Sequence, residues 1–225
     1  MNVRSFFFPA VIVLMSLAAQ AQAVEMPLYE TGPSQDAAFV RFVNARSAPM
    51  EVKAGGGSQT GTTLQPSQPV SPFYTVRGNA SVKGIFKSAG LQSDIALKVK
   101  PGEFATVVAM PGGAAIAQTV LRESPDDFNA LKVSLAFYNL DAQCAGAGLN
   151  VVGRNAALFE NVASGALQRR ALNPVSISVQ LICKGQVTPA KLALGTLQAG
   201  QRYSIFVMSE GVGSKLLIAT DTVAR

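Results

Sequence analysis

Short apolar runs separated by turn residues follow one another along the chain, and the same arrangement occurs twice. Val40-Arg41-Phe42-Val43-Asn44 in the first half matches Leu135-Ala136-Phe137-Tyr138-Asn139 in the second. After each of these runs, at nearly equal spacing, a turn at Gly102 or Gly200 leads into a longer apolar run. Short strands with frequent turns are typical of β-sandwiches. We therefore expect an all-β protein made of two tandem small β-sandwich domains related by internal duplication.

Alternating or continuous apolar runs predict the individual strands. The expected strands of the first half are 38–44, 50–54, 80–86, 95–100, 104–110 and 116–120. Those of the second half are 132–140, 150–152, 158–162, 165–172, 176–183, 192–197, 203–208 and 216–223. The glycine-rich segment 55–63 is expected to be a flexible loop, and the prolines within 65–72 favour an edge segment. The sequence has no sustained helical periodicity, so we expect a helical turn or two at most, for example at 128–131.

Residues 1–23 have the three parts of a secretory signal peptide. Arg4 supplies the positive start, an apolar run covers 6–19, and Ala21-Gln22-Ala23 is a small-residue cleavage site. The apolar run is shorter than the roughly 20 residues that a spanning helix needs. We therefore expect cleavage and export, with an uncleaved anchor as the alternative.

The segment Ser124-Pro125-Asp126-Asp127 is the best candidate for a domain boundary, because it combines turn residues with a proline that ends the preceding strand. We expect an N-terminal sandwich at 24–123, a linker at 124–131 and a C-terminal sandwich at 132–225.

The chain has two cysteines, Cys144 and Cys183, both in the second half. In an exported protein, an isolated pair of this kind most simply forms a structural disulfide. Their wide separation differs from the C-x-x-C spacing of redox pairs.

No histidine occurs in the sequence. This excludes Ser-His-Asp and Cys-His nucleophilic catalysis, histidine metal sites and the usual general base near neutral pH. The acidic residues are scattered singly beside turns, apart from the adjacent Asp126 and Asp127, so a carboxylate pair for glycoside chemistry is not indicated. We expect no enzyme activity, no cofactor and no metal.

The formal net charge is +6, without the clustered basic runs that suggest nucleic-acid binding. Arg169-Arg170 is the paired basic feature, and guanidinium groups suit the carboxylates of a partner or of an acidic polysaccharide. Phe73-Tyr74 is the aromatic pair that we expect to be exposed, as a weak candidate for stacking on a sugar. A solvated strand edge remains the alternative for the arginines.

Several segments spread over the chain resemble the AlgF family of periplasmic alginate O-acetylation factors. They are Pro27 to Pro33, Phe42 to Asn44, Val99 to Ala109, Ser124 to Lys132, Gly165 to Arg170 and Asn173 to Ser176. The resemblance implies a role in O-acetylating mannuronate residues of alginate during export. It also implies partners, namely a membrane acyl-transfer protein and periplasmic acetyltransferases, and it supplies no catalytic residues for this component. The expected function is therefore a non-catalytic periplasmic adaptor, and the alternative is a module that binds the anionic alginate chain itself.

Overall fold

The computed structural model describes residues 37–55, 61–111, 114–124, 129–154 and 156–224. Residues 1–23, where the signal peptide is expected, lie outside these ranges, as do residues 125–128 of the expected linker. The described residues include no helix that could cross a membrane.

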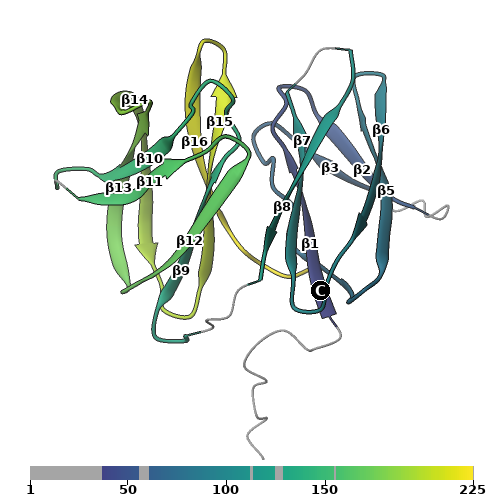
Figure 1. Cartoon of the computed structure of the whole chain (residues 1–225), viewed down its shortest axis with the longest axis horizontal. Helices are drawn as coiled ribbons and strands as arrows, with labels where there is room; N and C mark the ends of the chain where they lie inside the picture. Colours follow the sequence, from purple (N-terminus) through teal and green to yellow (C-terminus); the bar gives the residue numbers. More distant parts are fainter. Residues whose placement is uncertain (1–36, 56–60, 112–113, 125–128, 155, 225) are drawn as a thin grey trace, which may run out of the picture.

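The first half of the chain is a sandwich of two four-stranded sheets, in the orders β4-β1-β7-β8 and β3-β2-β5-β6 (Figure 1). Its strands are β1 (Ala37–Asn44), β2 (Met50–Ala54), β3 (Gly61–Leu64), β4 (Tyr74–Arg77), β5 (Ser81–Ser88), β6 (Leu91–Lys98), β7 (Phe104–Met110) and β8 (Ala117–Glu123). All pairings are antiparallel except that of β1 with β7, which is parallel.

The second half repeats this topology strand for strand, in the orders β12-β9-β15-β16 and β11-β10-β13-β14. Its strands are β9 (Val133–Asn139), β10 (Ala147–Val151), β11 (Ala157–Val162), β12 (Ala166–Leu172), β13 (Val175–Cys183), β14 (Gln186–Leu197), β15 (Arg202–Glu210) and β16 (Gly213–Thr220). The parallel pair is again the matching one, β9 with β15. The expectation of an all-β protein with two duplicated sandwich halves is confirmed.

Strand register shows which residues of the two halves correspond. Asn44 lies opposite Ala109 on β7, and Asn139 lies opposite Val207 on β15. The turns before these strands also match, because Gly102 and Gly200 both have positive φ, 76° and 73°, which glycine adopts without strain.

Two strands of the described structure were not expected from the sequence. β3 falls within the segment assigned to a flexible loop, because Gly61–Leu64 has neither apolar alternation nor β-branched apolar residues to signal a strand. β4 begins directly after the proline-rich segment 65–72 and is only four residues long. Both are edge strands, where short lengths are common.

Buried apolar side chains fill the space between the two sheets of each half. In the first half this core includes Met50, Phe86 and Val107, and in the second half it includes Phe137, Leu149 and Leu181. A further buried cluster joins the halves to each other, since it combines Val43 and Val108 with residues of β9 and β15.

The C-terminal residues cross from the second half to the first. After β16, the chain runs beneath β8 to the edge of the first half (Figure 1). There the amide of Phe73 donates to the Thr222 carbonyl at 2.7 Å, and the amide of Ala224 donates to the Phe73 carbonyl at 2.7 Å. The sequence assigned residues up to 225 to the second sandwich, but this last segment pairs with the first.

A candidate interaction site between the two halves

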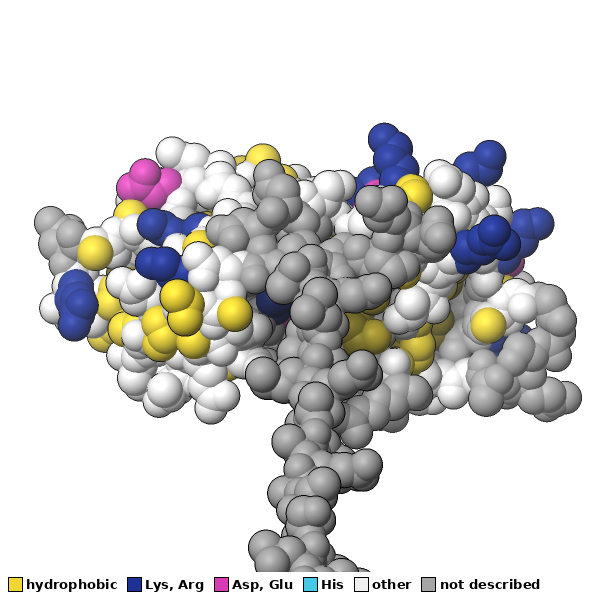
Figure 2. Space-filling view, turned by 90° about the horizontal axis from the view of Figure 1, so that it is seen from below, with side chains coloured by type: hydrophobic (Ala, Val, Ile, Leu, Met, Phe, Trp, Pro, Cys, Tyr) yellow, Lys and Arg dark blue, Asp and Glu magenta, His cyan; other side chains and the backbone are white. Residues whose placement is uncertain are grey.

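The two halves pack through corresponding sheets, β4-β1-β7-β8 and β12-β9-β15-β16. Val43, Val108, Tyr138 and Phe206 form the apolar centre of this interface, and the rings of Tyr138 and Phe206 are stacked with centroids 4.8 Å apart. When the molecule is seen from below, its visible surface shows more Lys and Arg side chains than Asp and Glu side chains (Figure 2).

Arg41 of β1 is the most prominent polar residue of the interface, with 1% of its surface exposed. Its guanidinium donates to Asp221 at 2.7 Å, to Thr106 at 3.0 Å and to Ser204 at 2.9 Å. It also lies over the ring of Phe73, 4.4 Å from the centroid, in a cation–π contact. A single side chain of the first half therefore binds a strand of the second half and its C-terminal segment.

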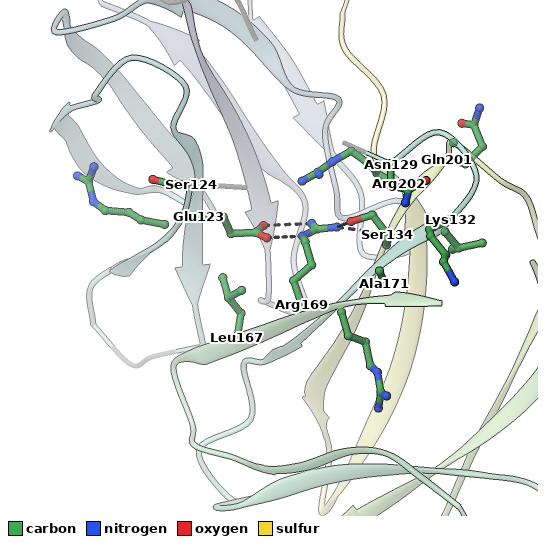
Figure 3. A pocket seen from close by; sticks show the side chains of 14 residues that line it. Glu123, Ser124, Asn129, Lys132, Ser134, Leu167, Arg169, Ala171, Gln201 and Arg202 are labelled. Carbon is green, nitrogen blue, oxygen red and sulfur yellow. Dashed lines mark hydrogen bonds and ion pairs between the residues drawn. The ribbon is translucent and has the colours of Figure 1, made fainter. Parts of the chain in front are cut away.

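Arg169 of β12 completes the polar part of the interface from the other side. It forms a bidentate ion pair with Glu123 at the end of β8 and donates to Ser134 at 3.0 Å (Figure 3). It also donates to Asp221 at 3.1 Å. Burial alone would lower the pKa of the Arg169 guanidinium. The hydrogen bond and charge of Glu123 outweigh burial, so the pKa is raised and the cation is permanent.

The pKa values of Tyr138 and Asp221 are also shifted, for different reasons. Burial raises the pKa of the Tyr138 hydroxyl to about 12, and this hydroxyl donates to the Glu123 carboxylate. Burial alone would raise the pKa of Asp221, but the charges of Arg41 and Arg169 outweigh it, and the pKa is lowered. Two arginine side chains thus face two acidic side chains, and this balanced set stabilises the interface between the halves.

A cleft of ≈ 440 Å³ lies beside this network, at the seam between the halves (Figure 3). Its cationic side chains are Arg122, Lys132, Arg169, Arg170 and Arg202, and its acidic side chain is Glu123. Basic side chains therefore dominate the wall.

Contacts within the protein already engage these cations. Arg122 forms an ion pair with Glu103 at 2.5 Å, and Lys132 donates to the Asn173 side-chain oxygen at 2.6 Å. Arg202 lies over the Phe104 ring at 4.8 Å from its centroid. Burial, and then the charge of Arg169, lowers the pKa of Arg202. Lys132 donates to a neutral oxygen, as does Arg170 to the Leu158 carbonyl, so the charges of these two side chains stay available to an anion.

The structure separates the two arginines that the sequence suggested as a pair. Arg169 pairs with Ala136 and faces the other half, whereas Arg170 pairs with Leu135, lies on the opposite face of β12 and is exposed. The Arg170 guanidinium donates to the Leu158 carbonyl at 2.6 Å. Neighbouring residues on a strand point to opposite faces, so the two guanidinium groups have different partners, although both residues line the cleft.

The expected exposed aromatic pair is also corrected. Phe73 is buried, with 1% of its surface exposed, between Arg41 and the edge of the Phe104 ring. Tyr74 is half-buried, and its hydroxyl lies 3.1 Å from the Thr62 hydroxyl. The two aromatic side chains therefore do not form a common platform for a sugar ring.

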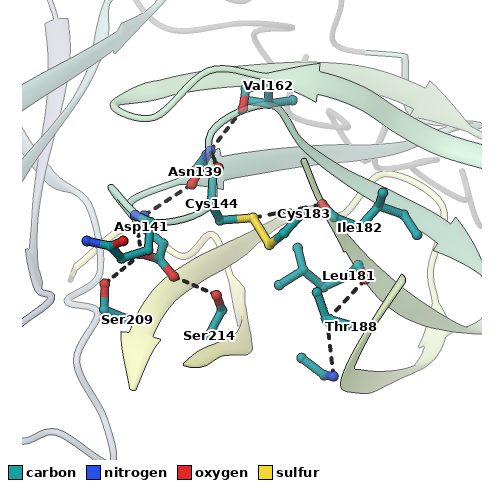
Figure 4. Close-up of a disulfide and its surroundings, with 12 residues drawn as sticks. Asn139, Asp141, Cys144, Val162, Leu181, Ile182, Cys183, Thr188, Ser209 and Ser214 are labelled. Atoms are coloured by element: carbon teal, nitrogen blue, oxygen red, sulfur yellow. Dashed lines mark hydrogen bonds between the residues drawn. A yellow bond between two sulfur atoms is a disulfide. The ribbon is translucent and has the colours of Figure 1, made fainter. Parts of the chain in front are cut away.

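The expected disulfide between Cys144 and Cys183 is confirmed, with a Cα–Cα distance of 5.0 Å (Figure 4). It connects the loop after β9 to the end of β13. The Asn139 side chain holds the same loop, because its amide donates to the carbonyls of Cys144 at 2.7 Å and Val162 at 2.9 Å. The disulfide is thus part of the local framework of the second half and leaves no free thiol.

The sequence analysis did not identify Arg41, Glu123 and Asp221, which form ion pairs at the interface. A signal was present for Arg41, since a charged residue between Val40 and Phe42 interrupts an otherwise apolar run and must find a partner when the strand is buried. Among the described residues, no group of Asp, Glu and Cys side chains is placed to hold a metal ion.

A model of the family described as "Alginate O-acetyl transferase AlgF" matches residues 11–204. The chain belongs to the AlgF family. Membership gives this AlgF-family protein a role in alginate O-acetylation. A comparison with curated proteins found no match.

Solved structures with a similar arrangement include that of the C-terminal domain of AlgF from P. aeruginosa. It is 16% identical over 40% of this chain and 98% of that domain, with a TM-score of 0.34. A candidate cell adhesion protein from Bacteroides uniformis is 11% identical over 82% of this chain and 98% of its own, with a TM-score of 0.30. Another candidate cell adhesion protein, from Bacteroides ovatus, is 10% identical over 85% of this chain and 99% of its own, with a TM-score of 0.28.

Proposed function

We propose that this protein is a non-catalytic periplasmic adaptor that is required for O-acetylation of alginate and bridges the acetyltransferase components. The observation that supports this most directly is the interface between the halves, where Arg41, Glu123, Arg169 and Asp221 form a buried and charge-balanced network. Together with the apolar cluster and the C-terminal crossing, this network holds two sandwiches in one fixed arrangement. A rigid body with two separate sets of outer surfaces suits a protein that positions two partners.

The chemistry of the side chains supports a non-catalytic role. The sequence has no histidine, and both cysteines are in the disulfide. The carboxylates of Glu123 and Asp221 are buried and occupied by ion pairs with arginines. A serine or a water molecule near these groups would therefore lack a base, and general-base help is typically worth a factor of about 10²–10⁴ in rate.

Direct binding of alginate is the second candidate, and the basic cleft is the observation that favours it. Mannuronate carboxylates would suit Lys132 and the neighbouring arginines. Against it, Arg122 and Arg169 already pair with carboxylates of the protein itself. We therefore rank contact with protein partners above contact with the polymer.

The proposal is tested on the purified mature protein and in cells. The isolated protein should not turn over an acetyl-ester donor, and it should capture periplasmic acetylation components in pull-downs. Expression of the protein should restore alginate acetylation in cells from which this protein has been deleted. Turnover by the isolated protein would contradict the non-catalytic role, and failure to capture any component would contradict the adaptor role.

A parallel titration with alginate tests the second candidate function, direct binding of the polymer. Lys132→Glu changes the cleft, and Lys184→Glu, on the exposed turn between β13 and β14, is the matched control. Binding of alginate that Lys132→Glu weakens and Lys184→Glu does not would favour the polymer-binding role.

A further inference from the structure

The sheet β3-β2-β5-β6 of the first half has one face on the sandwich core and one face turned away from the second half (Figure 1). Successive side chains of a strand point to opposite faces, so the buried Phe86 of β5 identifies the core side. Lys83 and Lys87 of the same strand therefore point outward, and both are exposed. The other sheet of the first half lies between this outer face and the interface with the second half.

Lysine side chains of three neighbouring strands form a row across this outer face. Lys53 of β2 pairs with Ile85, and Lys98 of β6 pairs with Ser81. Each of these two lysines is therefore a diagonal neighbour of Lys83 on β5, at a distance of roughly 7–8 Å. We define the lysine face as the outer surface that carries Lys53, Lys83, Lys87 and Lys98.

Two acidic side chains on the lysine face offset these cations only in part. Glu51 forms an ion pair with Lys53 at 3.1 Å, but both side chains are more than a third exposed, and such surface pairs are weak. Asp94 lies opposite Ile85 on β6 and is exposed. Four lysines against two carboxylates leave the face with an excess of positive charge.

The corresponding face of the second half is a reference within the same chain. The turns after β5 and β13 match, because Ala89-Gly90 and Lys184-Gly185 all have positive φ. Strand pairings counted from these turns give the residues of the second half that occupy the four lysine positions. In the order of Lys53, Lys83, Lys87 and Lys98, they are Asn150, Ser178, Ile182 and Thr196. All four are uncharged, so the excess of cations belongs to the first half and is not a property of the fold.

An apolar centre and the two carboxylates indicate the class of partner. Ile85 lies between Lys83 and Lys87 along β5 and is half-buried, so it can pack against an apolar side chain of a partner. Glu51 and Asp94 would repel the uniform negative charge of a polyuronate, whereas a folded protein can place a cation opposite each of them. Complementary charges fix the orientation of two proteins and speed their encounter. The lysine face thus fits a protein with a mainly acidic surface better than it fits a polyanion.

We propose that the lysine face docks an acidic surface of a partner protein, whose carboxylates contact Lys53, Lys83 and Lys98. This inference rests on the adaptor function proposed above, and it assigns one docking surface to the N-terminal sandwich. None of these three lysines lines the basic cleft between the halves, so the two surfaces can be altered independently.

Binding of the full mature chain to each purified periplasmic acetyltransferase of the alginate machinery tests the proposal. The wild type should bind one of them, and binding should weaken as the salt concentration rises from about 50 to about 500 mM, because salt screens exposed charges. Lys83→Gln with Lys98→Gln should weaken binding by about fivefold or more, since each lysine lost removes an exposed charge contact. Ser178→Glu with Thr196→Glu is the matched control, because it changes the net charge equally at the corresponding positions of the second half. This control should leave binding unchanged.

Two further measurements separate loss of charge from loss of fold, and a protein partner from a polymer. Lys83→Arg with Lys98→Arg keeps both charges and should bind as the wild type does, with an unchanged unfolding temperature in all variants because the positions are exposed. If Lys83→Gln with Lys98→Gln weakens the binding of alginate but not that of the acetyltransferase, the polymer is the occupant and the proposal is wrong.

The remaining outcomes distinguish the lysine face from the adaptor function. Acetyltransferase binding that the glutamine variant retains, or that the control variant loses to the same extent, would overturn the proposal and leave the adaptor function standing. Absence of wild-type binding to every acetyltransferase would overturn both.

Discussion

At the scale of single residues, two buried asparagines explain the most regular feature of the sequence. Asn44 and Asn139 end corresponding strands, and each side-chain amide donates to two backbone carbonyls, one in the following loop and one in the edge strand. Each side-chain oxygen also accepts an amide two residues later, from Arg46 or Asp141. A side chain with donors and an acceptor in this geometry is required, which explains why both repeats end in asparagine.

Replacing Asn139 by aspartate should therefore be costly. The carboxylate would face the carbonyls of Cys144 and Val162 without a proton to donate, and each unsatisfied buried group costs about 1–3 kcal/mol. We expect Asn139→Asp to lower the free energy of unfolding by at least about 2 kcal/mol in denaturant titrations. Asn173→Asp, at an exposed position, should change it by less than about 0.5 kcal/mol. Equal effects of the two substitutions would contradict this account.

Because of Tyr138, the free energy of unfolding should fall at alkaline pH. Its pKa is about 12 in the folded protein, against roughly 10 in an unfolded chain. A raised folded pKa contributes stability that is complete below pH 10 and is lost as the pH rises toward 12. Unfolding midpoints of the wild type should fall more steeply over this range than those of Tyr138→Phe. Parallel curves for the two proteins would contradict the prediction.

The sequence located the repeated strands but not the direction of individual side chains. Phe104–Met110 was expected at its observed limits because a continuous apolar run signals a central strand. Arg169 was not expected to face the other half, and Phe73 looked exposed, because burial between two domains leaves no local pattern. For Arg41 the apolar run does signal a buried charge, but its partners Ser204 and Asp221 lie far along the chain, so the sequence could not identify them.

At the scale of elements, the two halves secure the same loop by different means. In the second half the disulfide joins the loop after β9 to β13, and in the first half the corresponding end of β5 uses a hydrogen bond. There the Ser88 hydroxyl donates to the Pro49 carbonyl at 2.8 Å. Ser88 and Cys183 occupy matching positions, as the pairings of Val52 with Phe86 and of Leu149 with Leu181 show.

Removing the disulfide should consequently affect stability more than removing its counterpart. A link across a sequence separation of 39 residues is worth about 2–4 kcal/mol, and a hydrogen bond about 1 kcal/mol. The double substitution Cys144→Ala with Cys183→Ala should therefore lower the thermal unfolding temperature by more than Ser88→Ala does. The reverse order in calorimetry would show that the loop depends little on the disulfide.

At the scale of the whole molecule, the halves meet as the subunits of a symmetric dimer would. Val43 corresponds to Tyr138 and Val108 to Phe206, and all four side chains share one buried cluster. Phe104 corresponds to Arg202, and these two residues contact each other across the interface. Contact between matching positions is the mark of an isologous interface, here formed within a single chain.

The charged pair at this interface should control the stability of the complete molecule. Arg41→Ala leaves the buried Asp221 carboxylate without its closest cation, and loss of one partner from a buried ion pair costs about 3–5 kcal/mol. We expect a loss of this size in denaturant titrations. Arg77→Ala, on the exposed side of β4, is the control and should change stability by less than about 0.5 kcal/mol. A small effect of Arg41→Ala would mean that apolar contacts alone hold the halves together.

The crossing of the last residues matters to anyone who labels this protein. Because Ala224 is hydrogen-bonded to Phe73, a fluorophore, affinity tag or proximity-labelling enzyme fused to the C-terminus would emerge beside β4. Neighbours detected from such a fusion would be those of the N-terminal sandwich, although the label is attached to the other end of the chain. To survey the surroundings of the C-terminal sandwich, a probe belongs in the exposed turn at Lys184–Gly185.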